Sequence, residues 1–449
     1  ERLVEYWLVD ELCAKQDSYK AIRAVNDIWN VYLWTRIVDR NGDAPYFNEE
    51  GVFAAGQGQT LAYSSVKSIY MDLLKRLQAD SDILANTAGQ GDLGSYDPLY
   101  NNDFAKWRRF ANTLIMRLAM HLSNTDSAAE AKTFYQKAEA LAMNNIEDYA
   151  RVHCDASVWG DYYDRTAYDW GEARPDEKFM EVMNGINSGY KTNMVDPRRN
   201  IWFMAGTEPA NAGYNSWQGY PDATTEAGTE SAYTSAHGGA NSFALLNYGD
   251  ANGFFWFDNH KTAINNLCWC IASYSETLFL KAEAALRGWN SGNAESLYKE
   301  AIKASMQEVS WFVKTSGGNV TISDSQVNAY INALPAFGSS KEDQLRSVMI
   351  QKWIGLFPNS CEAWVEIRRT GYPEVGIVSY PIIDPAAEVS NGNLIQRMSY
   401  PDNEYNTNNA NIPEKYQKGG ANYAKRGEKG LYWSLAGEDG TLSKTAKPK

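Results

Sequence analysis

Residues 274–306 read YSETLFLKAEAALRGWNSGNAESLYKEAIKASM, and this stretch decides the fold. Each of its halves repeats apolar or small residues at intervals of three, four and seven, which places them on one stripe of an α-helix. Between the halves, Gly288 and Gly292 can end one helix and turn the chain. The stretch therefore predicts two closely packed antiparallel helices. Their stripes consist of Tyr274, Leu278, Ala282 and Ala285, and of Ala294, Leu297, Tyr298, Ala301, Ile302 and Ser305.

A helical hairpin of this kind is typical of tetratricopeptide-like repeats, which bury their apolar faces only by stacking on similar units. Further helical stripes occur in 1–38, 65–85, 106–122, 127–143 and 341–370. We therefore expect a single, mainly α domain over 1–449, with a hairpin scaffold in 1–145 and 270–370. The helical period fades in 146–269 and again in 371–449. A long irregular region inside a folded chain usually carries function.

Charge and cysteine content exclude several classes of protein. The net charge is −13 and the pI is near 5.0, which argues against a nucleic-acid or anionic-membrane surface. No apolar run approaches transmembrane length. The chain starts without an export signal, so such a signal either never existed or has been removed. The five cysteines form neither a disulfide framework nor a CxxC zinc pattern, so buried thiols are expected.

Catalytic and metal-binding motifs are missing from the sequence. It has no GxGxxG, Walker loop, HExxH, GxSxG or EF-hand pattern. The four histidines lie far apart, and His121 falls within an amphipathic helix, where a structural role is expected. A pair of carboxylates for glycoside hydrolysis stays open, since 55 acidic residues are available. Acidic residues between 155 and 169 could bind Ca²⁺, but a solvated loop is favoured and no cofactor is expected.

Aromatic residues cluster with polar ones in the irregular region, at 159–170, 214–222 and 254–258. A sugar needs flat rings to stack on its C–H face and polar side chains for its hydroxyls. The alternative interpretation is that the rings anchor the loops to the scaffold. We predict that rings of this region stack on a sugar, with Asn215, Gln218 and Asp222 as hydrogen-bonding partners. The predicted rings are Trp159, Tyr162, Tyr163, Trp170, Trp217 and Tyr220, with Tyr214 and Trp256 as second choices.

Motifs in the same order along the chain resemble those of the SusD/RagB family, the surface lipoproteins of Bacteroidota that capture nutrients. The stretch around 351–373 is the most specific of them. The resembling stretches are 39–46 (DRNGDAPY), 107–123 (WRRFANTLIMRLAMHLS), 196–198 (DPR), 274–288 (YSETLFLKAEAALRG), 351–373 (QKW followed by EAWVEIRRTGYP) and 397–406 (RMSYPDNEYN).

The resemblance implies a SusD-like fold of four tetratricopeptide-like helix pairs and no catalysis. It implies an oligosaccharide or polysaccharide ligand and a partner, a SusC-like TonB-dependent transporter, over which the protein sits as a lid. It also implies a cell-surface position in the outer membrane, with a lipid anchor at an N-terminal Cys that this chain lacks. Three alternatives stay open: peptide capture within the same family, an adaptor that binds only proteins, and a glycoside hydrolase. The acidic net charge disfavours polyanionic ligands.

Overall fold

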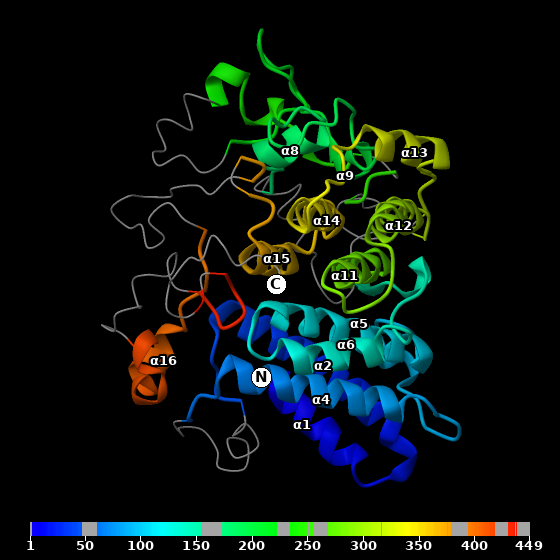
Figure 1. Cartoon of the computed structure of the whole chain (residues 1–449), viewed down its shortest axis with the longest axis vertical. Helices are drawn as coiled ribbons and strands as arrows, with labels where there is room; N and C mark the ends of the chain where they lie inside the picture. Colours follow the sequence, from blue (N-terminus) through cyan, green and yellow to red (C-terminus); the bar gives the residue numbers. More distant parts are fainter. Residues whose placement is uncertain are drawn as a thin grey trace.

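Helices dominate the computed structural model of the chain, which Figure 1 shows as two stacked helical layers. The lower layer contains α1, α2, α4, α5 and α6. The upper layer contains α11, α12, α14 and α15, with α13 and the short α8 and α9 above it and α16 to one side. The structure describes residues 2–46, 61–153, 173–221, 234–249, 252–255, 268–315, 317–374, 376–378, 394–417, 430–435 and 437.

The helices between residues 1 and 145, in 274–306 and in 341–370 follow the predicted stripes, whereas α8, α9, α13 and α16 are short helices that the stripes do not predict. Their bounds are α1 (Arg2–Cys13), α2 (Lys20–Asn41), α4 (Val66–Ile83), α5 (Phe104–His121), α6 (Ala128–Ala138), α8 (Glu177–Met183), α9 (Arg199–Trp202), α11 (Tyr274–Leu286), α12 (Ala294–Thr315), α13 (Asp324–Ala333), α14 (Lys341–Gly355), α15 (Ser360–Thr370) and α16 (Asp402–Thr407). The strands form two antiparallel pairs, β1 (Ala150–His153) with β4 (Cys268–Ala272), and β2 (Phe203–Met204) with β3 (Leu245–Leu246). The mainly α prediction is therefore confirmed.

The predicted hairpin is α11 and α12. Ser273 caps the start of α11 by accepting a hydrogen bond from the Glu276 backbone, and Gly288 adopts a positive φ of 67° in the turn that follows. The helix differs from the prediction in one respect. The stripe pattern predicts one buried face, whereas most of α11 is buried, including Glu276 and Glu283. The reason is that α11 packs between α12, α14 and α5, so its polar positions also lose contact with water.

Two hydrophobic cores lie on either side of α11. The first fills the space between α2, α4, α5 and α6 and includes Leu114 and Leu280. The second lies between α11, α12, α14 and the segment around α8 and α9, and includes Phe179 and Trp202. Since α11 contributes to both cores, it joins the two layers.

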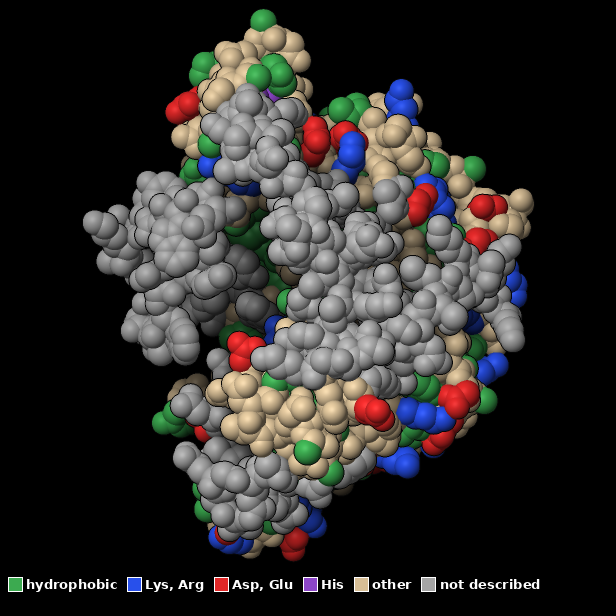
Figure 2. Space-filling view, turned by 90° about the vertical axis from the view of Figure 1, so that its left-hand side faces the viewer, with side chains coloured by type: hydrophobic (Ala, Val, Ile, Leu, Met, Phe, Trp, Pro, Cys, Tyr) green, Lys and Arg blue, Asp and Glu red, His purple; other side chains and the backbone are tan. Residues whose placement is uncertain are grey.

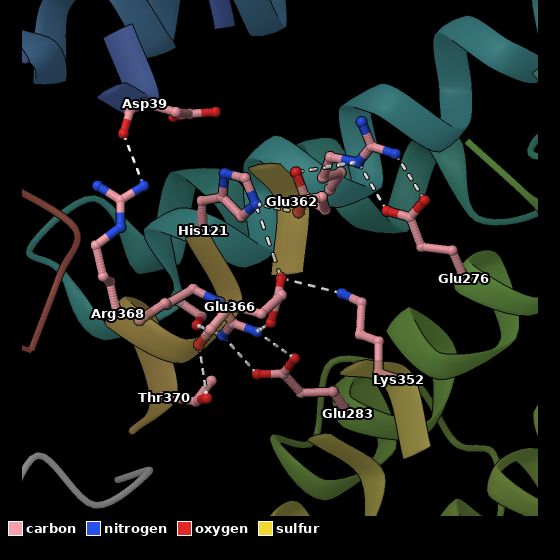
Figure 3. A network of polar contacts seen from close by, with 12 residues as sticks. Asp39, His121, Glu276, Glu283, Lys352, Glu362, Glu366, Arg368 and Thr370 are labelled. Atoms are coloured by element: carbon pink, nitrogen blue, oxygen red, sulfur yellow. Dashed lines mark hydrogen bonds and ion pairs between the residues drawn. The ribbon is translucent and has the colours of Figure 1, made fainter. Parts of the chain in front are cut away.

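A buried network of charges crosses the boundary between the layers (Figure 3). Arg117 of α5 pairs with Glu276 of α11 at 2.6 Å, and the Nε2 atom of His121 lies 2.9 Å from Glu362 of α15. Lys352 of α14 lies 3.0 Å from Glu366 of α15. Each of these side chains is at most 3 % exposed. Buried ions need partners because desolvation is costly, so the network specifies how the helices pack.

Glu283 is the centre of one half of this network. Both of its oxygens accept hydrogen bonds of 2.7 Å from Arg369, and Arg287 donates a further one of 2.8 Å. Burial by itself would raise the pKa of Glu283, but the positive charges of Arg369 and Arg287 outweigh burial and lower that pKa below its usual range. The carboxylate therefore stays ionised inside the protein.

The Glu283→Gln variant tests this ion pairing. Loss of the negative charge leaves buried guanidinium groups undercompensated, so the free energy of unfolding should fall by about 3 kcal/mol in urea denaturation at pH 7. Because the native pKa of Glu283 is depressed, its stabilisation is present above the unfolded pKa of about 4.3 and is lost as the pH falls below it. The variant should therefore lose less stability than the parent between pH 5 and pH 3.

The matched control is Glu295→Gln. Glu295 lies on α12, pairs with Lys299 at 2.7 Å, and both side chains are 49 % exposed. Its loss should change the free energy of unfolding by less than about 0.5 kcal/mol. Equal effects of the two substitutions would contradict a stabilising role of the buried pair.

Candidate functional site

A cleft of about 510 Å³ lies between α8, the end of α14 and the start of α15. Figure 2 shows the side of the molecule that lies on the left in Figure 1, where hydrophobic side chains line a hollow at the height of α8 and α15. The described residues that line the cleft are Ala173, Arg174, Pro175, Asp176, Phe179, Leu246, Phe255, Trp353, Phe357, Pro358, Asn359, Ser360, Ala363, Trp364, Ile367 and Val378.

The turn between α14 and α15 builds the floor of the cleft. Pro358 has no backbone N–H and cannot continue α14, so the helix ends just before it. The Asn359 side chain then accepts a hydrogen bond from the Glu362 backbone and starts α15. This geometry holds Phe357 against Phe179, with ring centroids 5.5 Å apart, and Trp353 packs edge-on against Phe179 at 4.8 Å. The floor is therefore aromatic and fixed by the second core.

One wall of the cleft is formed by Trp364 of α15. Its indole nitrogen donates to the Ile395 carbonyl at 2.9 Å, and the Arg368 guanidinium stacks 3.4 Å from its ring. A cation over one face of the indole fixes the ring orientation. The exposed part of the ring then forms a flat surface beside the floor.

Polar groups lie around this aromatic surface. Arg174 donates to Asn241 at 3.2 Å, and Asp176 caps α8 by accepting from the Phe179 backbone at 2.9 Å. The Asn359 amide donates to the Ile271 carbonyl at 3.2 Å, and Ser360 is exposed. A mostly apolar pocket with a few fixed polar groups is typical of a binding site for small molecules.

Six of the residues predicted to bind a ligand lie outside the described residues: Trp159, Tyr162, Tyr163, Trp170, Asp222 and Trp256. Two described residues that line the cleft are their neighbours in sequence. Ala173 follows Trp170 by three positions, and Phe255 directly precedes Trp256. The cleft is thus built from residues that flank two of the predicted aromatic clusters.

The other predicted residues lie on the loop 205–221, beside the cleft. Tyr220 exchanges backbone hydrogen bonds with Pro175 and Glu177, and the Gln218 side chain donates to Glu177 at 3.1 Å. The lining of the cleft, as far as the structure describes it, does not include Tyr214, Asn215, Trp217, Gln218 or Tyr220. The structure therefore brings this loop next to the cleft but gives these side chains local contacts.

Those contacts hold the loop in place. The Arg199 guanidinium stacks 3.8 Å from the Trp217 ring, and Asn215 accepts from the Trp217 backbone at 2.9 Å. Tyr214 lies 4.9 Å from His237, whose ring stacks on Phe243 at 3.7 Å. Tyr214 is 38 % exposed, so its ring remains accessible. That the predicted residues of this loop bind a ligand stays a prediction.

Sequence reasoning missed Trp353, Phe357 and Trp364 as residues of a binding site. They lie in the 351–373 stretch, whose helical pattern predicts a part of the scaffold. The signal that could have found them is the density of aromatic residues on both sides of Pro358, where the helical pattern breaks. A break between two helices places side chains from both at one surface.

Among the described residues, His121, Glu362 and Glu366 form a group with metal-ligand chemistry, whose ligand atoms lie within 4.8 Å of one another. Cationic side chains already lie next to the two carboxylates of this group. Arg117 lies 3.8 Å from Glu362, and Lys352 lies 3.0 Å from Glu366. A dication here would meet these buried positive charges, so the group acts as part of the ion network.

Comparison with known proteins identifies relatives of this chain. A family model described as SusD-like, starch-binding and associating with the outer membrane matches residues 5–401. The chain is similar to a solved chitin-binding protein, with 24 % identity, a TM-score of 0.74, and coverage of 96 % of this chain and 84 % of that one. A search of curated proteins found no match.

Two further solved structures have the same fold. One is a SusD homologue from Bacteroides thetaiotaomicron, with 23 % identity and a TM-score of 0.67 over 96 % of this chain and 84 % of that one. The other is a chitin-binding SusD homologue from Flavobacterium johnsoniae, with 22 % identity and a TM-score of 0.68 over 90 % and 79 % of the two chains. The similarity therefore extends over nearly the whole chain.

The described helices include none that is both long enough and apolar enough to span a membrane.

The Trp217→Ala variant tests how far this ring is structural. It removes the stack on Arg199 and contacts with the second core, so the free energy of unfolding should fall by about 2 kcal/mol. Urea denaturation followed by circular dichroism measures it. The control, Tyr214→Ala, should cost less than about 1 kcal/mol because that ring is exposed. A smaller loss for Trp217 than for Tyr214 would contradict the structural role.

Proposed function

Because the chain belongs to the SusD-like family, described as starch-binding and associating with the outer membrane, we propose that it captures an oligosaccharide or polysaccharide at the cell surface for import. The observation that carries this proposal is the aromatic cleft beside the turn between α14 and α15. Its rings offer flat apolar surfaces, and its rim offers amide, hydroxyl, carboxylate and guanidinium groups. This combination matches the amphipathic faces of a sugar ring.

The cleft supports binding by rings that are oriented before the ligand arrives. Phe357 is held by Phe179 and neighbouring rings, and Trp364 is held by Arg368 and the Ile395 carbonyl. A ligand that stacks on fixed rings loses less affinity to side-chain ordering. Trp159, Tyr162, Tyr163, Trp170 and Trp256, which lie outside the described residues, remain proposed as further rings that stack on the ligand.

The partner and the anchor belong to the same proposal. A SusC-like TonB-dependent transporter would receive the glycan, with this protein as a lid over its barrel, and a lipidated Cys before residue 1 would tether it to the outer membrane. We propose no catalytic step, in keeping with a family described as starch-binding, and the one carboxylate among the described lining residues, that of Asp176, caps α8. An acid and a base at a scissile bond would require a second carboxyl group nearby.

Native affinity electrophoresis tests the proposed function. The protein runs through gels that contain plant or host polysaccharides, and retardation by one polymer without release of reducing sugar is expected. The Trp353→Ala variant should weaken this binding about tenfold, equivalent to about 1.4 kcal/mol, because it removes part of the aromatic floor.

The matched control is Trp311→Ala. Trp311 is a partly buried residue of α12 that stacks with Arg151 at 4.4 Å and does not line the cleft. This variant should be retarded like the parent protein. Absence of retardation on every polymer would favour peptide capture instead, and release of reducing sugar would favour a hydrolase. Equal loss of binding in both variants would place the site elsewhere.

A further inference from the structure

A second cavity, of about 410 Å³, lies in the lower layer between α1, α2 and α4. Figure 1 shows these helices at the end of the molecule opposite to α8, so this cavity is separate from the aromatic cleft. Its wall is polar and aromatic rather than apolar. The described residues that line it are Tyr6, Trp7, Asp10, Arg23, Ala24, Asp27, Tyr46, Asp72, Arg76, Asp80 and Ile83.

Most of the guanidinium nitrogens of this wall already donate to protein oxygens. Every nitrogen of the Arg76 guanidinium donates to a protein oxygen. Its acceptors are Asp27, with Nε at 3.1 Å, Tyr46, with Nη1 at 2.6 Å, and Asn30, with Nη2 at 2.7 Å. Arg23 donates to both oxygens of Asp10, at 2.6 and 3.0 Å. An anion would therefore have to break these pairs to bind.

The hydroxyl groups of two tyrosines in this wall also donate to protein oxygens. The Tyr6 hydroxyl donates to Asp27 at 2.6 Å, and the Tyr46 hydroxyl donates to Asp72 at 2.6 Å. The wall also offers the remaining lone pairs of carboxylates and the faces of aromatic rings. A complementary ligand is thus rich in donors and positively charged, because an ammonium group has three donors and no acceptor.

Asp80 shares a side-chain hydrogen bond with Asp27 but carries one oxygen that the described residues leave unused. Asp80 is only 6 % exposed and lines the cavity. Its Oδ2 atom has no hydrogen-bond partner among the residues that the structure describes. An unsatisfied buried acceptor is costly to the folded state. A donor placed in the cavity would satisfy it.

The net charge of the cavity and its aromatic rings both favour a cationic ligand. If Asp80 is protonated, the carboxylates of Asp10, Asp27 and Asp72 outnumber the two guanidinium groups, so the cavity has an excess of negative charge. Tyr6, Trp7 and Tyr46 supply ring surfaces to which a cation is attracted. A neutral or anionic ligand gains neither the attraction to the negative charge nor the attraction of a cation to the rings.

We propose that this cavity binds an organic ammonium group, with Asp80 as its buried acceptor and the rings of Tyr6 and Trp7 as part of its wall. The group could be carried by an amino sugar or by a lysine side chain, which share this chemistry. This site is independent of the proposed glycan cleft, and either could fail without the other.

Binding of a cation here is coupled to a proton. Burial, and then the negative charge of Asp27, raise the pKa of Asp80 to about 10, so Asp80 holds a proton at neutral pH in the empty cavity. An ammonium favours the carboxylate and displaces that proton, so the affinity for an amine that stays protonated over this range, such as a lysine side chain, should rise with pH from 6 to 9. The charged and titratable groups that line the cavity with Asp80 are Tyr6 and Asp10 of α1, Arg23 and Asp27 of α2, Tyr46 of the following loop, and Asp72 and Arg76 of α4.

Isothermal titration calorimetry on the full chain tests this site. The probes are glucosamine, Nα-acetyl-lysine amide, and N-acetylglucosamine as a neutral control with the same sugar ring. At least one amine should bind saturably, N-acetylglucosamine should not bind at this site, and titrations in buffers of different ionisation enthalpy should show proton release. The Asp80→Asn variant should weaken amine binding about tenfold and abolish that proton release.

The matched control is Asp82→Asn, which removes an exposed carboxylate from the same helix. It should bind the amine like the parent chain, and both variants should still be retarded by the polysaccharide that the parent binds. The amine that binds identifies the source of the ammonium group.

Three results would overturn the proposal. These are absence of binding by both amines, equal binding of N-acetylglucosamine and glucosamine in a manner that Asp80→Asn does not alter, or unchanged amine affinity in Asp80→Asn. If the Asp80→Asn variant does not fold, the measurements on the parent chain alone test the proposal. Absence of proton release and a flat affinity between pH 6 and 9 would then refute the site.

Discussion

The need to pair buried charges is the constraint on which the rest of this structure depends. Arg369 of α15 lies in the interior with both Glu283 of α11 and Glu366 of its own helix, and Lys352 of α14 shares Glu366. Any sliding of one helix along another would leave a buried ion without its partner, at a cost of several kcal/mol. Hydrophobic stripes alone tolerate such shifts far better, because apolar contact has no direction. The ion network thus gives the hairpin scaffold a unique arrangement.

This rigid scaffold places the aromatic cleft. The turn at Pro358 lies between two helices that the network holds, so Trp353 and Trp364 project from positions that cannot move independently. Arg368 connects the aromatic cleft to the lower helical layer. It donates to the Asp39 carbonyl of α2 at 2.7 Å and also stacks on the Trp364 ring. The orientation of a ring in the cleft is therefore fixed by a contact to the opposite layer. A binding surface on such a base needs little rearrangement when a ligand arrives.

Two buried carboxyl groups, those of Glu283 and Asp80, show how surroundings decide the chemistry of such a group. Glu283 is surrounded by guanidinium groups, so its pKa is lowered and it serves as a structural anion. Asp80 is also buried but lies beside the carboxylate of Asp27, so its pKa is raised and it retains a proton. The first group is satisfied by the protein itself, and the second has an oxygen that the described residues leave unsatisfied. Burial is common to both, and only the sign of the neighbouring charge differs.

The sequence by itself determined the long scaffold helices and their order, because the repeat of apolar residues every three or four positions is a local property. The α11–α12 hairpin, α5 and the helices on either side of Pro358 could all be predicted this way, whereas the short α8, α9, α13 and α16 could not. The charge partners could not, since Arg117 and Glu276 are 159 positions apart, and His121 and Glu362 are 241 positions apart. Of the predicted binding residues that the structure describes, Trp217 proved to stack on Arg199. The cleft instead unites Trp353, Phe357 and Trp364 with Arg174 and Phe255, because only the packing of α8 against α14 and α15 decides which distant side chains share one surface.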